Sequence, residues 1–112
     1  MLLETPVRFP GAPPSLEALQ QRVSERTGLA IELQRGTHGN AELFHSEFPS
    51  ACDLLVGPDR ISLLHGPSLS YLEYATLASL VDLGGEYTGE KLPKFVNTKW
   101  HDRKWWQFVP RA

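Results

Sequence analysis

The sequence predicts a single α+β domain in which an antiparallel sheet carries two helices packed on one side. The chain has 112 residues, a length typical of one domain. Helical apolar spacing occurs at 16–27 and 71–83, and strand-like segments lie before, between and after these two ranges. Such grouping of strands favours α+β over a parallel α/β sheet, and a ferredoxin-like arrangement or an elaborated relative is the first expectation.

The N-terminal third predicts a strand followed by a surface helix. Residues 2–9 favour a strand, but Pro6 has no backbone N–H and therefore belongs at a sheet edge or a bulge. Ser15 is a good N-cap for a helix over 16–27. Gly28 can adopt the left-handed conformation that ends a helix, so the helix is bounded at both ends.

The middle of the chain predicts a run of strands. Residues 29–34 alternate apolar and polar side chains, as a half-buried strand does, and a second strand follows near 41–48. The clearest hairpin pairs 52–56 with 60–65 around the turn Gly57-Pro58-Asp59. These segments indicate an antiparallel sheet.

The second helix and the C-terminal segment complete the prediction. Ser70 and Glu73 have the spacing of a capping box, and the helix over 71–83 is apolar on nearly every side, which indicates burial on more than one face. Residues 95–100 and 105–109 then predict a C-terminal hairpin.

Charge is distributed unevenly along the chain. Residues 91–112 contain six basic residues and one acid, a formal charge of +5, whereas the first 90 residues carry −7. All three tryptophans lie in the same C-terminal segment. Because side chains alternate along a strand, the predicted hairpin has aromatic rings on both faces, and one core can cover only one of them. We expect partner binding through Lys99, Trp100, Arg103, Lys104, Trp105 and Trp106.

This surface favours a small, soluble, non-enzymatic binding protein that engages another macromolecule, as inhibitors, immunity-type proteins, adaptors and accessory subunits do. Tryptophan and arginine are enriched at the energetic centres of protein interfaces, so a protein partner is expected. Nucleic-acid binding through the tryptophans and lysines of the C-terminal segment is a less favoured alternative, because the acidic body would repel phosphate. Two further alternatives stay open: the tryptophans pack on the sheet of their own chain, or the hairpin pairs with a second copy in a homodimer.

The main alternative is a small enzyme or ligand binder with a pocket between the sheet and the second helix. Its polar groups would be His45, His65, Tyr71 and Tyr74. Cys52 lies on an apolar strand, where a cysteine is usually a small core residue rather than a nucleophile. The spacing of the carboxylates does not predict a converging pair, and the histidines lack metal-ligand spacing, so no metal and no cofactor is expected.

The predicted compartment is the cytoplasm. The chain has one cysteine, so it cannot form an internal disulfide, which fits a reducing environment. Its N-terminus lacks the pattern of a signal peptide, and no stretch of about 18 apolar residues is present to span a membrane.

Overall fold

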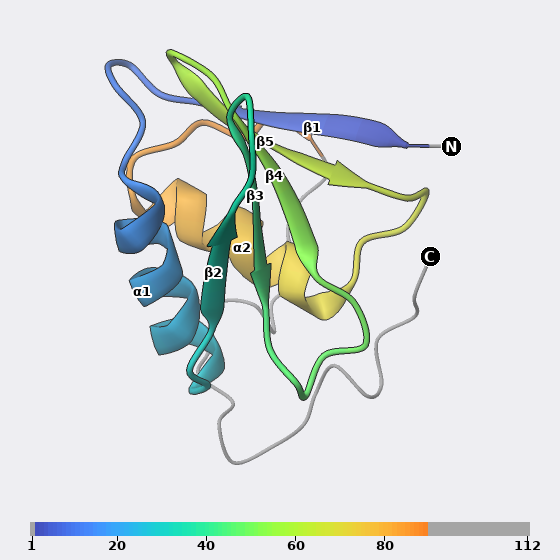
Figure 1. The fold of residues 1–112 in the computed structure, drawn as a ribbon. Coiled ribbons are helices and arrows are strands. Elements are labelled where there is room, and N and C mark those ends of the chain that lie inside the picture. Colours follow the sequence, from blue (N-terminus) through green and yellow to red (C-terminus); the bar gives the residue numbers. More distant parts are fainter. Residues whose placement is uncertain (1, 90–112) are drawn as a thin grey trace.

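The computed structural model describes residues 2–89 and confirms the α+β class (Figure 1). The elements follow in the order β1 (Leu3–Arg8), α1 (Leu16–Thr27), β2 (Glu32–Arg35), β3 (Asn40–Phe44), β4 (Cys52–Val56), β5 (Arg60–His65) and α2 (Tyr71–Asp82). The strands form one antiparallel sheet in the order β1-β5-β4-β3-β2. Both helices lie on the same side of this sheet, as the sequence predicts.

The topology departs from the ferredoxin-like first expectation. A ferredoxin-like domain has the order β-α-β-β-α-β, whereas in residues 2–89 four consecutive strands, β2 to β5, lie between α1 and α2. Strand β1 pairs with β5 at one edge of the sheet. This pairing joins segments far apart in the sequence, and no local pattern specifies it.

Both helices begin where their capping residues predict. The Ser15 hydroxyl accepts a hydrogen bond from the Ala18 backbone N–H at 3.1 Å, and Gly28 ends α1 with φ 72°. At α2 both halves of the capping box form. The Ser70 N–H donates to the Glu73 carboxylate at 2.7 Å, and the Glu73 N–H donates to the Ser70 hydroxyl at 3.3 Å.

Pro6 lies on the edge strand β1, as expected. Arg8 exchanges backbone hydrogen bonds with Glu86 on the side of β1 that faces away from β5, at 3.2 and 2.7 Å. Alternate residues of a strand direct their backbone groups to the same side. The nitrogen of Pro6 therefore also faces away from β5, and its missing N–H leaves the β1–β5 ladder intact.

Three strands are shorter than predicted: β1 by one residue at each end, β2 at its start and β3 at its end. β2 begins only at Glu32, because Ile31 is bonded to α1: its carbonyl accepts from the Gln20 amide at 2.7 Å, and its N–H donates to the Ser24 hydroxyl at 3.1 Å. β3 ends at Phe44, and the chain then turns so that the Phe48 N–H donates to the His45 carbonyl at 3.0 Å.

The hydrophobic core fills the layer between the sheet and the two helices. Both helices contribute to it, and α2 is buried around most of its circumference, as its apolar sequence predicts. The largest fully buried side chains are Leu19, Leu43, Leu54, Ile61, Leu63, Leu72, Leu77 and Leu80. Neither helix within residues 2–89 has the length and apolar character needed to cross a membrane.

Candidate functional site: the open face of the sheet

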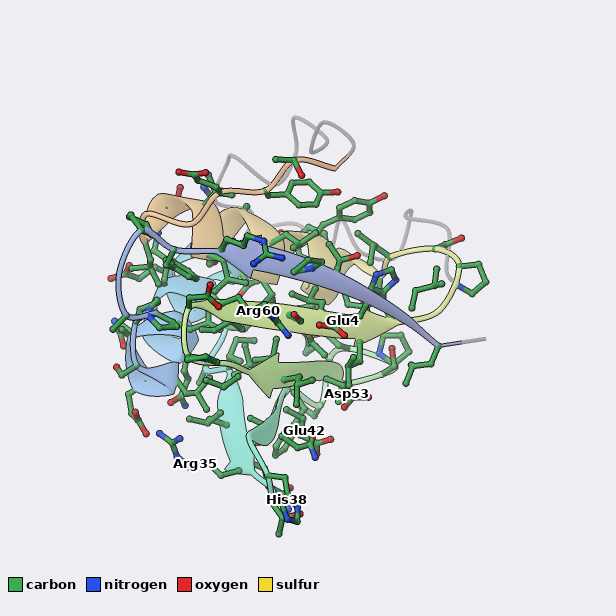
Figure 2. The ribbon with its side chains drawn as sticks, turned by 90° about the horizontal axis from the view of Figure 1, so that it is seen from above. Glu4, Arg35, His38, Glu42, Asp53 and Arg60 are labelled. Atoms are coloured by element: carbon green, nitrogen blue, oxygen red, sulfur yellow. The ribbon has the colours of Figure 1, made fainter. Side chains whose placement is uncertain are left out.

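One face of the sheet is not covered by a helix in residues 2–89, and we call it the open face (Figures 1 and 2). Alternation along the strands assigns residues to it. Leu54 and Leu63 are paired and buried in the core, so their neighbours Asp53 and Leu64, which also pair, lie on the opposite side. The open face is therefore built by every second residue of all five strands.

A single cross-strand row on the open face contains three carboxylates. The registers place Gln34 of β2 beside Glu42 of β3, Glu42 beside Asp53 of β4, Asp53 beside Leu64 of β5, and Leu64 beside Glu4 of β1. We call these five residues the acidic row. The row combines residues that are distant in sequence, so the sheet alone brings its charges together.

Glu42 and Asp53 lie directly opposite each other in the β3–β4 pair. The Val56 N–H donates to the Gly39 carbonyl at 2.9 Å, and this marks the hydrogen-bonded positions of the ladder. Hydrogen-bonded and non-hydrogen-bonded pairs alternate along an antiparallel ladder. The pair of Gly39 with Val56 is hydrogen-bonded, so Glu42 and Asp53, three positions further along, form a non-hydrogen-bonded pair, the geometry in which facing side chains come closest. Like charges in this position are destabilising, so the arrangement costs stability in the isolated chain.

The arginines of residues 2–89 do not pair with Glu42 or Asp53. There are five of them, and each pairs with another carboxylate: Arg8 with Asp59, Arg22 and Arg26 with Asp82, Arg35 with Glu17, and Arg60 with Glu4 of the acidic row. The hydrogen bond from Arg35 lowers the pKa of the Glu17 carboxyl. Within the described residues, Glu32, Glu42 and Asp53 of the open face thus have no ion-pair partner.

A shallow hollow of about 390 Å³ lies along the acidic row. Glu42 and Asp53 line it together with Leu2, Gln34, Arg35, Asn40 and Leu64, so its wall combines acidic, basic, amide and apolar residues. Leu2 is one of the most exposed large hydrophobic residues of the described chain, at 68%. Figure 2 shows Glu4 and Arg60 close together over the sheet, with Asp53 and Glu42 on the neighbouring strands.

Ser62 adds an unsatisfied polar group to the open face. It follows Ile61 and precedes Leu63, both of which point into the core, so alternation directs its side chain to the open face. Its hydroxyl oxygen is fully buried and has no hydrogen-bond partner among the described residues. A buried polar atom without a partner loses its hydration without compensation.

We expect Ser62→Ala to raise the free energy of unfolding by about 1 kcal/mol, because it removes this desolvated hydroxyl. Urea denaturation of both chains measures the change, and Ser68→Ala, at an exposed position, is the matched control with an expected change near zero. A lower free energy of unfolding in Ser62→Ala would show that the hydroxyl has a hydrogen-bond partner, contrary to the structure of residues 2–89.

The residues predicted to bind a partner lie outside the described residues. They are Lys99, Trp100, Arg103, Lys104, Trp105 and Trp106, all within 90–112. The structure therefore leaves the C-terminal hairpin as a prediction. The acidic row was missed at the sequence level, because its assembly depends on the register set by the irregular connection at 45–51.

The residues of the predicted pocket fall into two groups. His45 and Tyr71 both contact Phe48, with ring centroids 6.1 and 6.0 Å from it. His65 instead ends β5, where its Nδ1 donates to the Gly66 carbonyl at 2.7 Å and its Nε2 shares a 2.6 Å hydrogen bond with the Thr5 hydroxyl. The hollow beside His65, of about 360 Å³, is lined by residues that include neither His45, Tyr71 nor Tyr74.

Burial also limits the chemistry of these groups. Desolvation raises the pKa of Tyr71 to about 12, so its hydroxyl keeps its proton at neutral pH. Among the described residues, no three histidine, cysteine, aspartate or glutamate side chains are grouped so that they could hold a metal ion.

Cys52 lies fully buried in the core, in agreement with its interpretation as a small hydrophobic residue. Desolvation is the main cause that raises the pKa of its thiol, against the effect of a hydrogen bond with Thr76. We expect a disulfide reagent such as Ellman's to leave the folded chain unlabelled at pH 8 and to label it rapidly in denaturant. Rapid labelling of the folded chain would contradict this burial.

The site thus belongs to a compact α+β domain with a mixed acidic and apolar sheet face. The chain matches no protein-family model, and no curated protein or solved structure is significantly similar to it.

Proposed function

We propose that this chain is a small non-enzymatic binding protein that engages a protein partner, in the manner of an inhibitor, an immunity-type protein, an adaptor or an accessory subunit. The observation that carries the proposal is the open face: a five-stranded surface where carboxylates without ion-pair partners in residues 2–89 stand beside apolar side chains. Apolar groups supply contact energy at protein interfaces, and charges set orientation and association rate.

The C-terminal segment is proposed as a second contact surface. Its tryptophans and basic residues, Trp105, Trp106 and Lys104 among them, have the composition of interface anchors. We place the protein in the cytoplasm, as its single cysteine suggests.

The test is capture by the full chain from extract of its own cells, followed by size-exclusion chromatography of the recombined pair. We expect one protein to be retained and to co-elute at fixed stoichiometry. The double variant Lys104→Ala/Trp106→Ala should weaken this complex if the C-terminal segment contributes. Failure of every captured protein to co-elute would contradict the proposed function.

A further inference from the structure

We propose that the acidic row is the docking surface for a basic segment of a protein partner, with an arginine or lysine side chain seated between Glu42 and Asp53. This inference rests on the proposed function and specifies its partner chemistry. Glu42 and Asp53 face each other in a non-hydrogen-bonded pair, and both line the hollow of about 390 Å³.

The charge of the open face favours a basic protein segment as its binding partner. Residues 2–89 hold eleven carboxylates and five arginines, and the arginines are all engaged in ion pairs. A cation placed between Glu42 and Asp53 would replace their mutual repulsion with two attractive contacts. Binding therefore removes a cost that the isolated domain carries, and the same charge would repel a nucleic acid.

The shape and composition of the face favour a protein segment over a lone ion. Among the described residues, the carboxylates that line the hollow are Glu42 and Asp53. Gln34, Asn40, Leu2 and Leu64 line it with them, and Arg35, which is paired with Glu17, also contributes to the wall. Amides can hydrogen-bond a peptide backbone or a guanidinium, and the two leucines can contact the methylene stem of an arginine or lysine.

The neighbouring Glu4–Arg60 pair indicates how the face could be extended. Its closest atoms are 3.9 Å apart and both side chains are substantially exposed, so the pair is loose. Glu4 belongs to the acidic row through Leu64 and could be shared with an incoming cation. The row would then present carboxylates on three strands to one extended basic segment.

The test is a nuclear magnetic resonance titration of the ¹⁵N-labelled full chain with an oligoarginine peptide at about 0.15 M salt, where distant charges are screened. We expect saturable shifts concentrated at Gln34, Glu42, Asp53 and Leu64. Glu42→Gln/Asp53→Asn should weaken binding about five- to tenfold. The matched control Glu25→Gln/Glu86→Gln removes the same charge elsewhere and should weaken binding less than twofold.

Three outcomes would overturn the inference. Shifts spread over all acidic residues would indicate nonspecific attraction. Equal shifts with Ca²⁺ alone would indicate a cation site. Movement of the Glu42 and Asp53 signals on Lys99→Gln/Lys104→Gln, with no peptide present, would indicate occupation by the C-terminal segment of the same chain.

The affinity of the captured partner for the variants distinguishes this inference from the proposed function. Retention of that partner by Glu42→Gln/Asp53→Asn with unchanged affinity would overturn the inference and leave the proposed function standing. Loss of the partner in this variant, with retention in the matched control, would support both.

Discussion

Replacing Gly85 with alanine is expected to lower the free energy of unfolding by about 2–3 kcal/mol, an effect of overpacking in a closed site. A Cβ at this position would collide with Cγ1 of Val7, lie 2.8 Å from the Leu80 carbonyl oxygen and lie 3.0 Å from the Phe9 ring. Val7 is in β1 and Leu80 in α2, so the substitution would separate two elements that the core joins.

Urea or thermal unfolding measures this change, and Gly11→Ala provides the control. No atom lies within 4 Å of a Cβ built at Gly11, so alanine there should be nearly neutral. Gly85 also precedes Glu86, whose backbone pairs with Arg8 on the outer edge of β1. If Gly85→Ala matched Gly11→Ala in stability, the close packing of α2 against β1 described above would be wrong.

Replacing Asp82 with alanine is expected to lower the free energy of unfolding by about 2–3 kcal/mol, somewhat less than the loss typical of a fully buried pair. The Asp82 carboxylate at the end of α2 accepts hydrogen bonds from Nε of Arg22 at 2.8 Å and from Nε and Nη2 of Arg26 at 2.8 and 2.9 Å. The bond to Asp82 is the main cause that raises the pKa of Arg22.

The large effect comes from Arg26, whose side chain is only 10% exposed. Removal of the carboxylate would leave this buried guanidinium without its bidentate partner. The matched control is Glu25→Ala, which removes an exposed carboxylate that pairs with Arg22 and should cost less than about 0.5 kcal/mol. Equal effects of the two substitutions would contradict a structural role for the contact between α1 and α2.

Much of the local structure could be predicted, because short-range chemistry determines it. The α1 range was predicted without error, since Ser15 caps one end and Gly28 the other. The hairpin of β4 and β5 could also be predicted, because the residues at 57–59 favour a turn between two strands. The end of β3 was misplaced because Phe48, an apolar residue at strand spacing, lies in a turn and packs on Tyr71.

The sheet order and the acidic row could not be predicted, because both depend on pairing between distant segments. Nothing near Leu3–Arg8 specifies β5 as its neighbour. Glu42 and Asp53 are separated by an irregular connection, and a shift of one residue would move either side chain to the covered face. The predicted C-terminal hairpin lies outside the described residues and stays a prediction.

Recognition of a basic protein segment by the open face is tested most directly by the dissociation constant of the oligoarginine peptide, measured by calorimetry for three full-length chains. We expect Glu42→Gln/Asp53→Asn to bind the peptide about five- to tenfold more weakly than the native sequence does. The dissociation constant of Glu25→Gln/Glu86→Gln should stay close to that of the native sequence. Equal weakening in the two variants would contradict the claim, because net charge alone would then explain the binding.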